Sequence, residues 1–168
     1  TFWTKMQNAP LFIDDSPNMS LMEIRAKCRR LKQTNDLKLV VIDYLQLVRD
    51  PSKKDRYQEV SSISRDLKAL AKEFDCPVIA LAQLNRESEK GKRPKASDLK
   101  ESGQIEQDAD QIVLLHPKLQ TEDLMPTGVT EVLVTKNRHG KRGIVLVQDQ
   151  LDVCRFASVA QEQVGGAA

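Results

Sequence analysis

The chain has 168 residues, and its 26 lysines and arginines nearly balance 24 aspartates and glutamates, leaving a formal net charge of +2. That length suits one domain or a large piece of one, and a composition of 40% hydrophobic and 30% charged residues is typical of a folded protein. Apolar runs are far shorter than the roughly 20 residues that cross a bilayer, the first residues lack a signal-peptide layout, and the three cysteines lack CxxC spacing. We therefore expect a cytoplasmic protein with reduced thiols rather than a membrane, secreted or zinc-scaffolded one.

The first elements along the chain are a short strand at 11–13 and an amphipathic helix. Ser20 stands three residues before Glu23, the spacing of a capping box at a helix start. Apolar residues then recur at intervals of three and four, which predicts a helix of about three turns. They are Leu21, Ile24, Cys28 and Leu31.

A strand–helix–strand unit follows. Val40–Ile42 is β-branched throughout, a helical apolar pattern runs over 57–74, and a second apolar run occupies 78–82. This order predicts two parallel strands with a crossover helix. Because neither strand alternates with polar residues, we expect helices on both faces of the sheet.

The remaining chain predicts further strands separated by polar connections. The segment 84–100 holds six basic and three acidic residues, a local charge of 6 − 3 = +3. A third buried strand is predicted at 112–115, and two more at 131–136 and 144–148, joined by a glycine-containing hairpin loop. The fold expected from these elements is α/β, with mainly parallel strands and a C-terminal antiparallel hairpin.

Two polar residues follow the predicted parallel strands at the edge where such sheets bind ligands. Asp43 comes directly after four aliphatic residues, as in Walker B segments that help to hold Mg²⁺, although ordinary strand ends also have this pattern. A buried carboxylate at this place needs a partner. Gln83 follows the next strand, where its amide can contact phosphate, orient a water molecule or cap a turn.

The hairpin loop is basic, and this too has two interpretations. Lys136 and Arg138 flank Asn137, and Lys141 and Arg142 follow. Guanidinium groups suit phosphate, and an arginine from a neighbouring subunit can stabilise phosphoryl transfer. A charged hairpin tip can equally be no more than solvated.

A phosphate-cradling P-loop is missing from this sequence. That motif is GxxxxGK followed by Ser or Thr. The only Gly-Lys pairs are Gly91-Lys92 and Gly140-Lys141, and Arg follows each of them. A Ser-His-Asp set and a zinc-ligand pattern are not readable either.

Several segments, in this order, resemble the C-terminal motor domain of DnaB-type replicative DNA helicases, which are RecA-like hexameric ATPases. They are Phe12–Pro17, Ile42–Leu47, Ala82–Arg86, Asp98–Asp110 and Lys136–Gly140. The resemblance covers roughly residues 10–156 and is most specific in the long, irregular stretch that ends at Asp110. It implies an incomplete RecA-like (P-loop NTPase) domain over 1–158 and a flexible tail over 159–168.

The resemblance also implies roles at the nucleotide. Asp43 matches the Walker B aspartate that organises Mg²⁺ and the attacking water, and Gln83 matches the glutamine that senses the γ-phosphate. Lys136 and Arg138 match a basic pair that reaches into a neighbouring subunit's nucleotide site, with Arg138 as the arginine finger.

Lys100, Glu101 and Gly103 match the loop that holds the backbone of single-stranded DNA in the ring's channel. The family usually has Arg at the position of Lys100, so positive charge is kept and the forked geometry is lost. After Arg138 the family more often has Asn-Gly-Pro, so this hairpin tip is more basic than usual.

The function implied is part of an ATP-dependent helicase that translocates on single-stranded DNA and unwinds duplex DNA at the replication fork. ATP and Mg²⁺ are the implied cofactors, and a homo-hexamer, primase and a helicase loader are the implied partners. Without a P-loop, the free chain is expected not to hydrolyse ATP. The alternatives are a non-catalytic single-stranded-DNA-binding or interaction module and a RecA-like recombinase or repair ATPase.

Overall fold

A computed structural model describes residues 9–85, 92–99, 103–119 and 126–159. The chain divides into two compact units, 1–83 and 84–168. The expected tail lies outside the described residues from position 160 onward. No helix within the described part is long and apolar enough to cross a membrane.

Helix α2, Leu21–Asn35, opens the first unit and begins where the capping box predicts. The Ser20 backbone N–H donates to Glu23 Oε2 at 2.7 Å, and the Glu23 N–H donates to Ser20 Oγ at 3.3 Å. These bonds satisfy two backbone donors that a helix start otherwise leaves free. The capping box is confirmed, and Cys28 is buried on the apolar side of α2, as the periodicity predicts.

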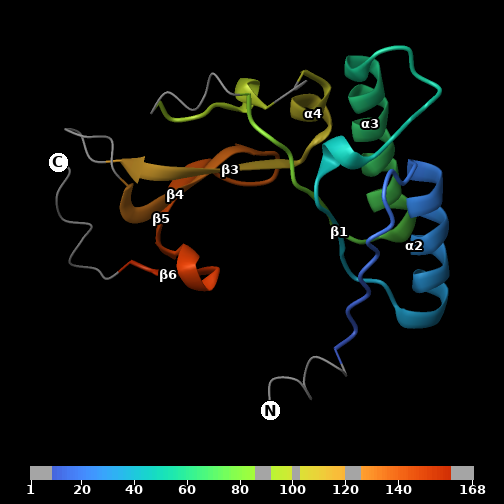
Figure 1. The fold of residues 1–168 in the computed structure, drawn as a ribbon, viewed down its shortest axis with the longest axis horizontal. Coiled ribbons are helices and arrows are strands. Elements are labelled where there is room, and N and C mark those ends of the chain that lie inside the picture. Colours follow the sequence, from blue (N-terminus) through green and yellow to red (C-terminus); the bar gives the residue numbers. More distant parts are fainter. Residues whose placement is uncertain (1–8, 86–91, 100–102, 120–125, 160–168) are drawn as a thin grey trace. The chain divides into compact units, whose positions relative to one another are not determined.

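Helix α3, Arg56–Phe74, carries more of the apolar core of this unit than any other described element and matches the predicted helix to within one residue. Asp55 caps it by accepting the Gln58 N–H at 2.8 Å. Its buried apolar side chains are Val60, Ile63, Leu67, Leu70 and Phe74. Glu73 joins α3 to α2 through ion pairs with Arg25 and Arg29, each of 2.6 Å, and Figure 1 shows the two helices side by side.

Strands β1, Val40–Ile42, and β2, Val78–Ala80, are parallel neighbours on either side of α3 in the sequence, which confirms the predicted strand–helix–strand unit. The expectation of helices on both faces is wrong for the described residues. Val41 and Ile79 are 56% and 52% exposed, whereas Ile42 is buried. Both helices pack together and cover one face, so the side chains that alternate to the other face remain open.

The predicted strand at 11–13 is also wrong. These residues have no regular secondary structure and are largely exposed. A strand requires a ladder of hydrogen bonds with a neighbour, and no described segment forms one with them.

The second unit is built on an antiparallel sheet with the order β3-β4-β5-β6. Its strands are β3 (Gln111–Leu119), β4 (Pro126–Asn137), β5 (Gly143–Gln150) and β6 (Arg155–Ser158). The hairpin of β4 and β5 is confirmed, and the antiparallel part is larger than predicted because β3 and β6 join it. Ile112 and Leu114 are buried while Val113 and Leu115 are exposed, so β3 is half-buried rather than buried.

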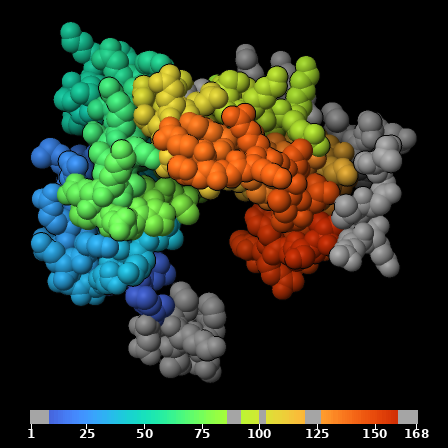
Figure 2. Space-filling view, turned by 180° about the vertical axis from the view of Figure 1, so that it is seen from behind, coloured from blue at the N-terminus to red at the C-terminus, as the bar shows by residue number. Residues whose placement is uncertain are grey.

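The described part of the basic connection, residues 92–99, lies against this sheet (Figure 2, yellow-green beside orange). It contains the short 3-10 helix Ala96–Asp98. The Arg93 guanidinium donates twice to the Glu131 carboxylate of β4, with both distances 2.6 Å. Glu131 is only 4% exposed, and Arg93 holds the pKa of this carboxyl below its ordinary value. This pair attaches the connection to the sheet.

Candidate functional site

Asp43 and Gln83 follow β1 and β2 and lie at the carboxyl edge of this parallel pair. The Leu45 N–H donates to the Leu81 carbonyl at 2.8 Å, which holds the two chain segments together just beyond the strands. The peptide bond after Asp43 is cis. Both side chains are exposed, so the expected buried carboxylate with a compensating partner is wrong: within the described residues the Asp43 carboxylate has no hydrogen bond or ion pair.

Asp43 fits one part of a magnesium site. In the described ranges no group of three or more His, Cys, Asp or Glu side chains is placed to hold a metal ion. Mg²⁺ commonly binds through one or two carboxylates together with substrate phosphates and water. An exposed carboxylate at a strand end can supply one such oxygen, and the other ligands must come from elsewhere.

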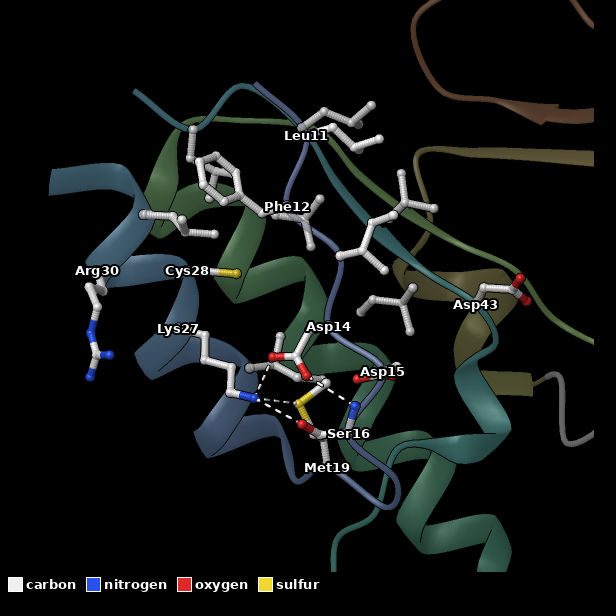
Figure 3. A pocket seen from close by; sticks show the side chains of 18 of the residues that line it. Leu11, Phe12, Asp14, Asp15, Ser16, Met19, Lys27, Cys28, Arg30 and Asp43 are labelled. Carbon is white, nitrogen blue, oxygen red and sulfur yellow. Dashed lines mark hydrogen bonds and ion pairs between the residues drawn. The ribbon is translucent and has the colours of Figure 1, made fainter. Parts of the chain in front are cut away.

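A hollow of about 1180 Å³ lies in the first unit between the N-terminal segment 10–19, α2 and β1 (Figure 3). Asp43 borders it on the side away from Lys27 and Arg30. Its wall is largely apolar, with side chains such as Phe12 and Cys28. The hollow therefore suits apolar packing better than phosphate.

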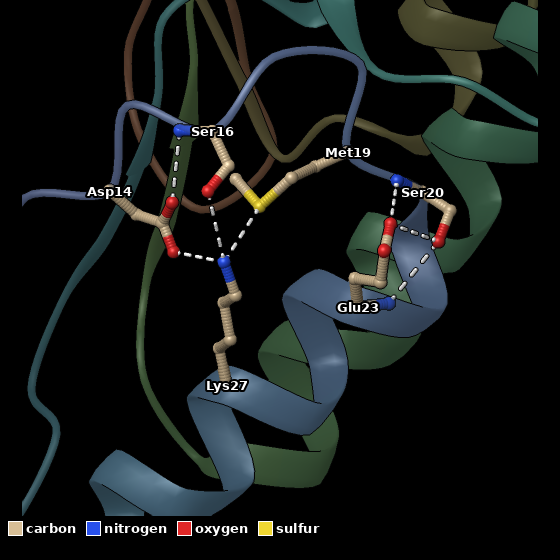
Figure 4. A network of polar contacts seen from close by, with 6 residues as sticks. All are labelled: Asp14, Ser16, Met19, Ser20, Glu23 and Lys27. Atoms are coloured by element: carbon tan, nitrogen blue, oxygen red, sulfur yellow. Dashed lines mark hydrogen bonds and ion pairs between the residues drawn. The ribbon is translucent and has the colours of Figure 1, made fainter.

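A polar cluster borders this hollow, and its positive and negative charges are paired with each other (Figure 4). The Lys27 ammonium pairs with Asp14 and also contacts Ser16 Oγ at 3.5 Å and Met19 Sδ at 3.4 Å. Lys27 and Ser16 together lower the pKa of Asp14 to about 2. Sequence reasoning did not single out Lys27, whose partner precedes α2 and shares no motif with it. Since the charge of Lys27 is already matched by Asp14, the cluster positions the segment before α2 and is a weak candidate for ligand binding.

Lys136 and Arg138 lie at the end of β4 and both contact helix α4, Gly103–Asp108. The Lys136 ammonium donates to the Glu106 carbonyl at 2.5 Å and to the Gln107 carbonyl at 3.1 Å. The Arg138 guanidinium donates to the Gln107 carbonyl at 3.3 Å. The structure thus brings together the two basic residues that the sequence singled out.

Asp110 completes this arrangement. Its carboxylate accepts a 3.1 Å hydrogen bond from Arg138, and its carbonyl accepts the Arg138 backbone N–H at 2.9 Å. The two side chains stay 42% and 47% exposed. Sequence reasoning missed Asp110, Glu106 and Gln107, because their proximity to β4 depends on the pairing of Gln111 with Asn137.

The tip of the hairpin is exposed at His139, Lys141 and Arg142. Asn137 closes the turn by donating to the Lys141 carbonyl at 3.1 Å. A Cβ at Gly140 would lie 2.6 Å from the Asn137 amide nitrogen, so a larger residue there would displace the Asn137 side chain from this bond. Among the residues expected to contact DNA, Gly103 is exposed at the start of α4, while Lys100 and Glu101 lie outside the described residues.

Solved structures identify the class of this fold. The parallel pair with its crossover helix, followed by antiparallel strands, is an incomplete RecA-like domain. A DnaB-like replicative helicase, whose structure addresses its interactions with primase, aligns with a TM-score of 0.84 and 36% identity over 94% of this chain and 39% of its own. A second solved chain, described as an ATPase domain, also gives a TM-score of 0.84 and 36% identity, and 58% of it is covered.

The chain belongs to the DnaB-like helicase C terminal domain family, which matches residues 1–158. It is 54% identical over 160 residues to the replicative DNA helicase DnaB of Leifsonia xyli, covering 93% of this chain and 35% of that protein. It is 49% identical over 145 residues to DnaB of Geobacillus stearothermophilus, covering 83% of this chain and 32% of that protein. The chain thus spans about a third of the length of these relatives.

Proposed function

We propose that this chain is the C-terminal part of the motor domain of an ATP-dependent replicative DNA helicase, which translocates on single-stranded DNA and unwinds duplex DNA at the fork. The observation that carries this proposal is the family match over 1–158, together with 54% identity to a replicative helicase. The domain is then 1–158, with the tail from 159 onward outside it.

At the nucleotide, Asp43 supplies a carboxylate to Mg²⁺ and orients the attacking water, and Gln83 contacts the γ-phosphate. When bound, Mg²⁺ supplies charge neutralisation at the phosphates. Lys136 and Arg138 act on the nucleotide of a neighbouring subunit, where the forked guanidinium of Arg138 stabilises charge on the transferred phosphoryl group. The exposure of Asp43, Gln83 and Arg138 supports these roles because each side chain is open to a ligand.

At the DNA, Lys100, Glu101 and Gly103 hold the phosphate backbone of one strand. Contacts of this kind fix position without reading sequence, which a translocating motor requires. The ring is a homo-hexamer located in the cytoplasm, and primase and a helicase loader are its partners.

The test is ATP hydrolysis with and without single-stranded DNA, measured on this chain and on the full-length helicase that contains it. We expect DNA-stimulated turnover in the full-length protein and none in the isolated chain, whose sequence has no P-loop. If the full-length protein binds single-stranded DNA but never hydrolyses ATP, the chain belongs to a non-catalytic binding module and the proposal is wrong.

A further inference from the structure

We infer that Arg56 and Glu59, at the start of α3, position Asp43 by holding the turn that follows it. The inference rests on the proposed function, in which the Asp43 carboxylate binds Mg²⁺ beside the nucleotide. It adds two positioning residues to that site. All three residues belong to the first unit.

The backbone of Asp43 leads directly into a short turn. Leu45–Leu47 form a 3-10 helix, and the Leu47 N–H donates to the Tyr44 carbonyl at 2.9 Å. Tyr44 is the next residue after Asp43. A displacement of this turn therefore moves the backbone that bears the Asp43 carboxylate.

The carbonyl of Gln46 is the point at which this turn takes an outside partner. In a 3-10 helix the Arg49 N–H would donate to it, but that N–H donates to the Met19 carbonyl instead, at 3.1 Å. A backbone carbonyl shielded from water needs a donor. Arg56 supplies one through Nη2 at 2.7 Å, and its Nη1 reaches the Val48 carbonyl at 3.5 Å.

Glu59 holds Arg56 in this position and bonds the same connection a few residues further on. It is buried, and its carboxylate pairs with Arg56 Nη1 and accepts the Asp50 N–H at 2.8 Å. Burial acts to raise the pKa of Glu59, but the Asp50 N–H and the Arg56 guanidinium outweigh it, so this pKa lies below its ordinary value. A buried carboxylate needs such partners, and Glu59 therefore retains Arg56.

The two side chains act as one unit. They lie three residues apart on α3, a spacing that brings side chains together on one side of a helix. The planar fork of a guanidinium can hold a carbonyl and a carboxylate at once in a fixed geometry. The bonds with Leu81 fix the backbone around Asp43 toward β2, and this pair fixes it toward α3. Displacement of a reacting group by about 1 Å can cost about a hundredfold in rate, so such support matters at a metal site.

The test measures how much Mg²⁺ contributes to nucleotide binding in the full-length protein. The readout is the ratio of the Kd values of a fluorescent, non-hydrolysable ATP analogue without and with Mg²⁺. Arg56→Met removes the donors and keeps much of the length of the side chain, so we expect this ratio to fall by about threefold or more. The Kd without Mg²⁺ should not change. Arg65→Met is the matched control and should keep the wild-type ratio, because Arg65 donates to the Ser61 carbonyl within α3, at 3.2 Å.

Glu59→Gln provides the same test if the Arg56→Met protein does not assemble, because its amide keeps one acceptor oxygen where the carboxylate offers two. Both changes break one contact, so the double variant should lower the ratio no further than the stronger single variant. A wild-type ratio in an assembled single variant overturns the inference, and so does a double variant in which the two losses add.

Asp43→Asn shows whether a negative result concerns the pair or the site itself. A wild-type ratio in this variant contradicts the proposed role of Asp43 at Mg²⁺, and the inference falls with it. A reduced ratio in Asp43→Asn, together with a wild-type ratio in Arg56→Met and Glu59→Gln, removes only the role of the pair and leaves the proposed function standing.

Discussion

Two backbone hydrogen bonds hold the chain on either side of Asp43, and the Asp43 side chain takes part in neither of them. The Leu81 N–H donates to the Ile42 carbonyl at 3.0 Å, and the Leu45 N–H donates to the Leu81 carbonyl at 2.8 Å. These bonds hold the backbone on both sides of Asp43 against the neighbouring segment, while the carboxylate remains exposed. The backbone is thus held independently of the side chain, so a change of side chain should leave the fold intact.

We predict that Asp43→Asn in the full-length helicase lowers the rate of ATP hydrolysis by about a hundredfold or more, because an amide is a poor replacement for a carboxylate beside Mg²⁺. Assembly should be unchanged, since the side chain has no partner among the described residues. The measurements are steady-state hydrolysis and light scattering of the assembled protein. Asp66→Asn, at an exposed aspartate of α3, is the control and should hydrolyse ATP normally. Normal hydrolysis by Asp43→Asn would remove this residue from the site.

At the scale of elements, the connection at 92–99 is attached to β4 by a paired charge. Glu131 is buried and needs a counterion, since a carboxylate removed from water without one is strongly disfavoured. Arg93 supplies it through two bonds of 2.6 Å. The attachment thus fixes the described residues 92–99 against the sheet.

We predict that Arg93→Met lowers the free energy of unfolding by about 1–2 kcal/mol at pH 7, a value discounted because Arg93 itself is largely exposed. Arg93 lowers the pKa of the Glu131 carboxyl, so this stabilisation is complete above the ordinary glutamate value of 4.5 and is lost as the pH falls through the lowered folded value. The difference between variant and wild type should therefore shrink under acidic conditions. Urea unfolding of the full-length protein at pH 7 and below pH 4.5 measures it.

Arg155→Met is the matched control for this pair. It removes the same charge from the same unit, but Arg155 bonds the neutral side chain of Gln150. We expect a smaller loss of stability with no comparable pH dependence. If both variants lose the same free energy of unfolding and the loss does not change with pH, the ion pair between Arg93 and Glu131 does not stabilise the fold.

The elements also show which features can be predicted from sequence. The capping box at Ser20 and the apolar spacing of 57–74 are local, so the starts and ends of α2 and α3 follow from them. The open face at Val41 and Ile79 could not be predicted, because it depends on which segments cover a sheet and not on the strand's own pattern. The contact of Lys136 with α4 depends on strand register, which spacing along the chain does not reveal.

At the scale of the whole molecule, the proposed role of Arg138 as an arginine finger would make each nucleotide site depend on two subunits. Arg138 is exposed at the end of β4 and is held by Asp110 in a way that leaves half of its surface open. In a closed ring with identical interfaces, a side chain that serves the neighbour makes every subunit dependent on the next. This dependence can be measured, because mixed rings then behave differently from a mixture of separate enzymes.

We predict that Arg138→Ala abolishes ATP hydrolysis and poisons wild-type subunits with which it is mixed before assembly. If each subunit acted alone, an equal mixture would keep about half of the wild-type activity. If one defective interface stops a six-membered ring, only about one sixty-fourth of randomly mixed rings remain fully active. The measurement is ATP hydrolysis across a series of mixing ratios. Activity that falls steeply with the fraction of variant indicates poisoned rings, whereas activity that falls in a straight line indicates independent subunits. Arg142→Ala, at the exposed tip of the same hairpin, is the control and should follow the straight line or show no loss, whereas a straight line for Arg138→Ala would contradict its action across the interface.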